Sequence, residues 1–225
     1  MEIFDSVIQM AAENKRGSRR ANLAWRACIV VTLAVVTARA WTQSPRTALQ
    51  AKPGEVILHL DPAQSKLHWT LGSTLHTVHG TFAMKRGEVR FDPASGSASG
   101  EIVADATSGA SGNEGRDKKM HREILESGRY TEVIFRPARI DGKVSMQGSS
   151  HVQVQGTFLL HGSEHELTVP VDAELAGGRW KGSAKFGVPY IQWGLKSPNT
   201  FFLKADPAVQ IEIELSGTLQ EAATP

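Results

Sequence analysis

Two histidines in the stretch His161-Gly162-Ser163-Glu164-His165 have the spacing H-x-x-E-H, which occurs in a class of zinc-dependent hydrolases. In that class the histidines bind zinc from one face of a helix. Here the flanking residues are typical of strands, and Gly162 and Pro170 disfavour a helix. We therefore predict a five-residue hairpin loop over 161–165. If the alternation of the flanking strands continues through the loop, His161 points outward and His165 inward. Their side chains would then diverge, so we predict no metal site here.

The other residues that could do chemistry have simpler interpretations. His76 and His79 are three residues apart at the start of a strand, which a transition metal could use, but a polar strand edge explains them as well. His121 follows two lysines and a methionine, where we expect a solvated helix face. No serine occupies a G-x-S-x-G motif, and no glycine-rich phosphate loop opens a helix. The sequence therefore predicts no catalytic residues, no metal and no cofactor.

The first forty residues are typical of an export signal. Residues 15–26 carry five basic residues and no acidic one, an uncharged run spans 27–38, and the segment ends in Ala38-Arg39-Ala40. This order predicts a secretory signal peptide over 1–40, cleaved after Ala40, and a periplasmic or secreted protein. An uncleaved anchor is the alternative, although a membrane span needs about 20 apolar residues. Ser18-Arg19-Arg20 leaves Sec and twin-arginine export both open.

Removing residues 1–40 changes the charge of the chain. The whole chain has 25 basic and 23 acidic residues, and six basic and three acidic ones fall in the signal, which leaves 19 and 20. The basic footprint of a nucleic-acid-binding protein is therefore absent. Cys28, the only cysteine, also lies in the signal, so the mature chain would depend on a packed core for stability.

From Val56 onward apolar and polar residues alternate with a period of two, which is typical of strands with one apolar face. Short turn signals separate the runs, as at Asp61-Pro62, Arg86-Gly87 and Gly177-Gly178. The pattern predicts an antiparallel meander, and about eight such strands closed on themselves leave a lumen for one small ligand. We expect the runs at 152–160 and 166–175 to pair.

The predicted organisation is a single domain. Residues 41–54 lack any period and form a flexible linker, residues 55–218 form the barrel, and residues 219–225 form a tail. Residues 116–126 predict one short amphipathic helix, ended by Gly128, that lies on the barrel or across one opening. The segment 188–203 carries four aromatic residues among prolines and a glycine, and we expect it to gate the mouth of the barrel.

The chain resembles the YceI-like family of bacterial exported proteins over about residues 56–216. The resemblance is carried by the order and spacing of the stretches at 60–69, 78–82, 87–93, 116–125, 130–135, 156–162 and 186–188. It implies a mainly β fold, namely an antiparallel lipocalin-like β-barrel with one short capping α-helix. It also implies binding of a polyisoprenoid lipid rather than catalysis.

We therefore predict that the apolar faces bind a ligand in the lumen and at its mouth. The candidate residues are Leu67, Trp69, Phe82, Phe91, Ile102, Met120, Ile124, Phe135, Phe158, Phe186, Trp193, Val209 and Ile211. The expected partner is an isoprenoid-type lipid or a quinone-like amphiphile, held for carriage, storage or stress protection. A histidine-dependent or metal-dependent hydrolase and a ligand-free structural or adhesion module are the alternatives. Transient membrane contact and a homodimer are left open.

Overall fold

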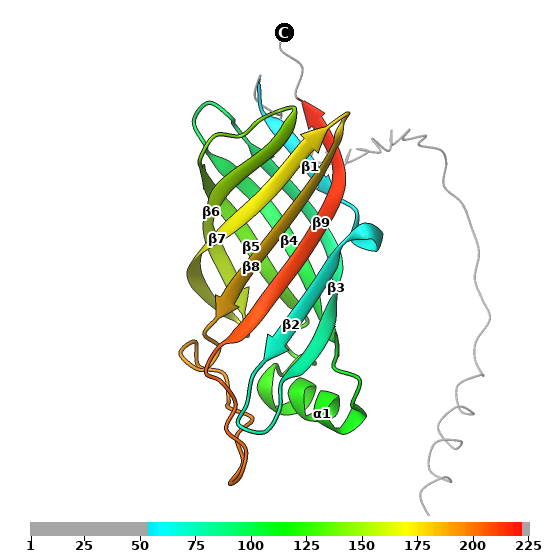
Figure 1. Ribbon diagram of the computed structural model, residues 1–225, viewed down its shortest axis with the longest axis vertical. Coiled ribbons are helices and arrows are strands. Elements are labelled where there is room, and N and C mark those ends of the chain that lie inside the picture. Colours follow the sequence, from blue (N-terminus) through cyan, green and yellow to red (C-terminus); the bar gives the residue numbers. More distant parts are fainter. Residues whose placement is uncertain (1–53, 222–225) are drawn as a thin grey trace, which may run out of the picture. The chain divides into compact units, whose positions relative to one another are not determined.

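The computed structural model describes residues 54–221, so the predicted signal peptide, all but the last residue of the predicted linker, and residues 222–225 lie outside the described part. Nine antiparallel strands form one sheet that closes into a barrel (Figure 1). The strands are β1 (Val56–Leu60), β2 (Lys66–Leu71), β3 (Val78–Phe91), β4 (Ala98–Ala110), β5 (Glu132–Asp141), β6 (Gly148–Leu160), β7 (Ser163–Ala176), β8 (Arg179–Val188) and β9 (Val209–Glu221). The helical segments are η1 (Pro62–Gln64), α1 (Glu114–Lys119) and η2 (Met120–Ile124).

The nine strands fill eight positions around the barrel, because β1 and β2 share one position between β3 and β9. Leu58 of β1 lies opposite Val89 and Leu219. Leu67 of β2 lies opposite Phe82 and Ile213, further along the same two neighbours. Every other strand pairs with the next one in the sequence, so the predicted antiparallel meander of about eight strands is confirmed, as is the pairing of 152–160 with 166–175.

The break between β1 and β2 is the predicted turn at Asp61-Pro62, and it stays attached to β9. The Asp61 side chain accepts a hydrogen bond from the backbone N–H of Ala63 at 3.1 Å, which caps η1. The backbone N–H of Asp61 donates to the carbonyl of Ser216 at 2.8 Å. The barrel wall is therefore continuous although this strand is interrupted.

Strand β3 is also continuous, so the turn predicted at Arg86-Gly87 is wrong. The register with β4 shifts between Met84 and Arg86, which marks a β-bulge. Even-numbered residues up to Met84 line the interior, and odd-numbered residues do so at Val89 and Phe91. Because of the extra residue in the bulge, even-numbered residues face inward before it and odd-numbered residues after it. In the sequence this break in the alternation looks like a turn between two strands.

Strand β9 extends to Glu221, which pairs with Val56, so the predicted tail boundary at 218 falls three residues too early. The helix spans 114–124 instead of 116–126, and Asn113 caps it by accepting from the N–H of Arg116 at 2.9 Å. It ends in a π-helical turn in which the N–H of Leu125 donates to the carbonyl of Met120. We predicted that Gly128 ends the helix, but the left-handed residue after it is Glu126, at φ 46°.

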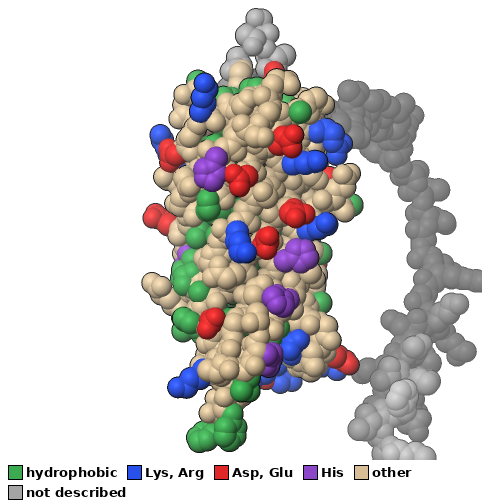
Figure 2. Space-filling view, in the orientation of Figure 1, with side chains coloured by type: hydrophobic (Ala, Val, Ile, Leu, Met, Phe, Trp, Pro, Cys, Tyr) green, Lys and Arg blue, Asp and Glu red, His purple; other side chains and the backbone are tan. Residues whose placement is uncertain are grey.

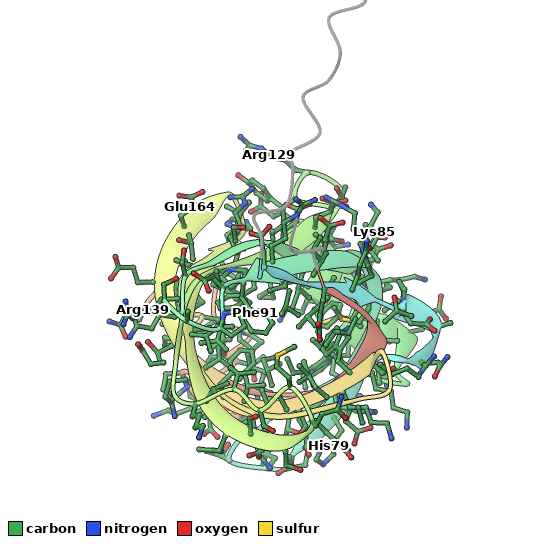
Figure 3. The ribbon with its side chains drawn as sticks, turned by 90° about the horizontal axis from the view of Figure 1, so that it is seen from above. His79, Lys85, Phe91, Arg129, Arg139 and Glu164 are labelled. Carbon is green, nitrogen blue, oxygen red and sulfur yellow. The ribbon has the colours of Figure 1, made fainter. Side chains whose placement is uncertain are left out.

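The strand order places the loops at two ends. The segments 72–77, 111–131, 161–162 and 189–208 lie at one end, which we call the helix end, and the turns at 92–97, 142–147 and 177–178 lie at the other, the far end (Figure 1). Seen along the barrel, Phe91 points into the ring, whereas Lys85, Arg139 and Glu164 point away from it (Figure 3). Among the described residues, no helix is long and apolar enough to cross a bilayer.

Candidate functional site

A cavity of about 630 Å³ lies inside the barrel, walled by inward side chains from every strand. Small residues leave this space unfilled, since Ala104, Ala173 and Ala184 lie on the wall beside large aromatic side chains. The alternation in the sequence puts Ala104, Ala106, Ala173 and Ala184 on the inward faces beside large aromatic residues, which indicates unfilled volume. Of these four, Ala106 is buried but does not line the cavity. The barrel is therefore hollow rather than filled by its own side chains.

Twelve of the thirteen predicted ligand-binding residues lie on the cavity wall: Leu67, Trp69, Phe82, Phe91, Ile102, Met120, Ile124, Phe135, Phe158, Phe186, Val209 and Ile211. Trp193 is not among the lining residues and lies in the loop after β8, at the helix end. Its ring stacks on His165 with centroids 4.2 Å apart and lies 5.6 Å from Phe158. The N–H of Trp193 donates to the carbonyl of Pro189, so the chain turns back and lays the indole on wall residues.

Polar and charged side chains join the wall mainly at the helix end. His76 and Thr200 come from the two loops there, and Arg116 and Lys119 come from the helix. Arg116 is held in place because its Nε donates to the Ser111 hydroxyl at 2.7 Å and its Nη2 to the Ser111 carbonyl at 3.0 Å. Most of the remaining wall is apolar, so the cavity has one cationic end.

The far end of the barrel is packed with apolar side chains. Trp180, Leu175 and Leu215 are buried there, and Val144 and Met146 from the β5–β6 loop pack against them. The indole Nε1 of Trp180 donates to the carbonyl of His59 at 3.2 Å. Gly217 permits this contact, because a Cβ at that position would lie 1.8 Å from the same carbonyl oxygen. This arrangement favours entry from the helix end.

Short hydrogen bonds fix the helix across its end of the barrel. His121 Nε2 lies 2.8 Å from the carbonyl of Gly109, and Nδ1 lies 2.8 Å from the hydroxyl of Ser127. Because a carbonyl only accepts, Nε2 carries a proton, and in the neutral ring Nδ1 then accepts from Ser127. The solvated helix face that we predicted for His121 is therefore wrong, since the half-buried ring joins β4 to the end of the helix.

Asp117 makes a second attachment for the helix. Its carboxylate accepts from the backbone N–H of Ser111 at 3.0 and 3.1 Å and also from the Ser111 hydroxyl. Burial favours the neutral acid, but these hydrogen bonds from Ser111 outweigh it and hold the pKa of Asp117 below its ordinary value. The same serine also binds Arg116, so one residue organises both charged side chains at the start of the helix.

The H-x-x-E-H stretch forms a hairpin turn, but it is shorter than predicted. Only His161 and Gly162 are in the turn, both with positive φ (52° and 77°), and Ser163 already belongs to β7. His161 lies against Tyr130, with ring centroids 4.3 Å apart, whereas His165 stacks on Trp193. Within residues 54–221 no group of three His, Cys, Asp or Glu side chains is placed to hold a metal ion.

Several wall residues were missed by the sequence analysis. Tyr190 and Leu195 are buried in the loop after β8, and both line the cavity. Their signal is weak, because an irregular loop has no period that identifies an inward side. Arg116 could have been found, since it lies three residues before Lys119 and four before Met120 on a predicted helix and shares a face with them.

A YceI-like domain model matches residues 58–217. The fold is similar to BcnA from Burkholderia cenocepacia, with a TM-score of 0.58 and 19% identity over 71% of this chain and 99% of that one. It is also similar to a polyisoprenoid binding domain from Saccharophagus degradans implicated in plant cell wall breakdown, with a TM-score of 0.54 and 14% identity over 75% and 100%. No curated protein sequence matches the chain. Since the family model spans the barrel from β1 to β9, the chain belongs to the YceI-like family.

Proposed function

We propose that this protein is an exported binding protein that holds a polyisoprenoid or similar amphiphilic lipid inside the barrel. The observation that carries the proposal is the apolar cavity of about 630 Å³ with cationic side chains at one end. The likeness in fold to a domain described as polyisoprenoid binding supports it. Export is supported by the basic flank, the apolar run and the Ala38-Arg39-Ala40 ending of the first forty residues.

The tail of the lipid would supply most of the binding energy. Burial of apolar surface contributes about 25 cal/mol per Å², or about 0.8 kcal/mol for each buried CH₂ group, before the costs of ordering are subtracted. Aromatic and aliphatic side chains form the middle of the cavity, where a branched isoprenoid chain would lie. The interior therefore favours lipids with a long apolar chain and does not select a particular polar group.

The polar head of the lipid would lie at the helix end, beside Arg116 and Lys119. A phosphate or another anionic head would pair with these two cations. Trp69 also lines the cavity, and its Nε1 has no hydrogen-bond partner among the described residues and is enclosed by protein atoms. A prenol hydroxyl or a quinone carbonyl in the lumen would accept a hydrogen bond from it once the indole turned towards the ligand. A quinone-like amphiphile is therefore the second ligand class.

Carriage between membranes, storage and stress protection all use the same binding step. Carriage and loading would both bring the helix end into transient contact with a membrane. A homodimer is compatible with each of these three roles. We propose binding as the activity because the side chains brought together inside the barrel form an apolar wall with a cationic rim, which suits retention of a ligand.

Native mass spectrometry of the mature protein, purified without detergent from its exporting cells, tests this proposal. We expect an adduct whose mass matches a prenol, a prenyl phosphate or a quinone, and which is lost on organic extraction. A zinc adduct would favour a metal-dependent hydrolase instead. Ligand-free protein that also fails to bind added undecaprenol or ubiquinone would favour the structural module.

A further inference from the structure

Three large apolar side chains project into solvent at the helix end. Phe201 and Phe202 are 92% and 80% exposed, and Leu75 is 67% exposed. We call these three residues the apolar tip. Figure 2 shows hydrophobic side chains projecting at the extremity of this end. Exposed apolar groups of this kind mark sites of interaction with another protein or with a membrane.

The apolar tip is presented by a hydrogen-bonded turn. The N–H of Thr200 donates to the carbonyl of Leu203 at 2.9 Å, and the N–H of Leu203 donates to the Thr200 hydroxyl at 3.2 Å. The two phenyl rings pack edge to face with centroids 4.9 Å apart. Thr74, next to Leu75, donates its N–H to the carbonyl of Lys204 at 3.0 Å, which joins the two loops.

The loop that carries the apolar tip also forms part of the cavity wall. Pro198, Thr200, Leu203 and Ala205 line the cavity, while Phe201 and Phe202, between them in sequence, point into solvent. A surface that covered the tip would therefore also face the mouth of the cavity. This continuity connects the exposed phenylalanines to the proposed route of a lipid.

The charge around the apolar tip is positive. Lys196, Lys204 and Asp206 are the charged side chains in the loop 189–208, which therefore has a net positive charge. Lys204 makes no ion pair among the described residues, and the Lys196 ammonium lies 3.8 Å from Glu126. Across the mouth, the helix adds Arg116 and Lys119. Basic side chains near an anionic bilayer are attracted to its surface.

The size of the apolar tip favours a bilayer over a protein partner. A phenylalanine buries about 150–250 Å², so the two rings offer less than about 500 Å². A stable protein interface buries about 800 Å² on each partner. Insertion into lipid needs no complementary surface, because apolar side chains enter the boundary between head groups and acyl chains directly.

We infer that the helix end docks on an anionic phospholipid bilayer, with Phe201 and Phe202 inserted and Lys196 and Lys204 against the head groups. The inference builds on the proposed exchange of lipid, and it assigns that exchange to one surface. Docking in this orientation brings the cationic mouth against the bilayer. A lipid could then pass between bilayer and lumen without crossing bulk water.

Vesicle flotation of lipid-free mature protein tests the docking. We expect binding to vesicles of phosphatidylglycerol and phosphatidylcholine, and weaker binding to phosphatidylcholine alone. The double variant Phe201→Ser/Phe202→Ser should reduce the bound fraction at least about tenfold, since each ring loses its burial in lipid. The same variant should still bind soluble farnesol, because neither ring lines the cavity.

Charge variants give a second arm with a matched control. Lys196→Gln/Lys204→Gln should weaken binding to the anionic vesicles and flatten its dependence on salt. Lys181→Gln/Lys185→Gln removes the same charge from β8, outside the helix-end loops, and should leave vesicle binding unchanged. Equal effects of the two pairs would overturn the orientation that we infer.

The remaining outcomes separate docking from lumen binding. Normal flotation of the phenylalanine variant would overturn the inference and leave the proposed lumen function intact. Loss of both flotation and farnesol binding would also overturn it, because the tip would then serve the lumen. A concentration-dependent dimer that the serine substitutions abolish, in protein that does not float, would assign the tip to a second copy of the chain.

Discussion

At the residue scale, His121 connects the helix to its neighbours through two hydrogen bonds. It accepts one from Ser127, just after the helix, and donates one to the carbonyl of Gly109 in β4. Its sequence neighbours are basic and indicate a solvent-facing position. Gly109 and Ser127 come close to the His121 ring only because of how the chain turns near 111 and 127. The residue types in the sequence do not give these distances, so the role of His121 could not be predicted.

The His121→Ala substitution should destabilise the protein by about 2 kcal/mol, because it removes two hydrogen bonds and leaves the buried Ser127 hydroxyl without its partner. Urea unfolding followed by tryptophan fluorescence measures this change. His151→Ala is the control, since His151 pairs with Asp172 on the exposed outer wall, and it should cost less than about 0.5 kcal/mol. Equal losses of unfolding free energy in the two variants would contradict this role of His121.

For the strand residues that face the lumen, in contrast, the sequence was enough to predict their orientation. Leu67 and Trp69 on β2, and Val209 and Ile211 on β9, alternate with polar residues, and all four line the cavity. A strand points successive side chains to opposite faces, so alternation fixes the inward set once one member is known. Trp193 lies in a loop without such a period, and it packs on Phe158 and His165 instead of lining the cavity.

At the scale of elements, the outer wall of β3, β4 and β5 holds a cross-strand ionic network over an apolar residue. Glu132 of β5 binds Arg86 and Lys85 of β3, each at 2.7 Å, while Arg86 also binds Glu101 of β4 at 3.0 Å. Val103 of β4, in register with Arg86, is fully buried although it faces outward. Long charged side chains cover apolar surface with their stems in this manner.

Hydrogen bonds from Arg86 and then Lys85 lower the pKa of Glu132 to about 2. A carboxylate with a lowered pKa stabilises the folded state above its unfolded pKa of about 4.5, and this contribution is lost as the pH falls towards 2. Glu132→Gln should therefore lower the unfolding free energy by about 1 kcal/mol at pH 7 and by almost nothing near pH 2. The effect is small because solvent screens the partly exposed Arg86 and Lys85.

Thermal or urea unfolding of the wild type and Glu132→Gln at pH 7 and near pH 2 checks this expectation. Glu166→Gln on β7 is the control, because Glu166 is exposed and has no ion pair among the described residues. It should not change stability at either pH by more than about 0.5 kcal/mol. A loss for Glu132→Gln that is the same at both values of pH would show that the charge of Glu132 is not the cause.

The elements themselves were predictable to different degrees. The strands after 98 follow a regular alternation, and the structure confirms them. The bulge in β3 changes which parity faces inward, so the sequence suggested two strands where there is one. The limits of the helix were missed by two residues, since its start depends on the Asn113 cap and its end on the left-handed Glu126.

At the scale of the whole molecule, the closed meander could be predicted because each strand pairs with its neighbour in the chain. The shared position of β1 and β2 could not, since it depends on pairing with β9, which lies about 150 residues away. No local pattern reports a contact of such long range. The existence of the cavity was indicated by alanines on the inward faces, but its shape depends on how the barrel closes.

Export is the first prediction at this scale. We expect a mature protein that begins near Trp41 and lies outside the cytoplasm, because residues 15–40 have the order of a cleaved signal. N-terminal sequencing of the protein from fractionated cells measures this. Full-length protein retained in the inner membrane with residues 1–40 attached would contradict it.

The hollow barrel is the central claim, and filling it is the most direct test. Ala184 is buried on the cavity wall, so Ala184→Phe places a ring in the space that the lipid would occupy. Ala176→Phe adds the same ring to an exposed position on β7 and is the matched control. The one measurement is undecaprenol binding to both variants and to delipidated wild type, together with their lipid-free melting temperatures.

We predict that Ala184→Phe weakens undecaprenol binding more than about tenfold, which is about 1.4 kcal/mol, while its lipid-free stability changes by less than about 1 kcal/mol. Ala176→Phe should bind as the wild type does. Two results would contradict the account. One is undecaprenol binding by Ala184→Phe that equals that of the wild type. The other is a loss of about 1–3 kcal/mol in its lipid-free stability, which is the cost of overpacking a solid core.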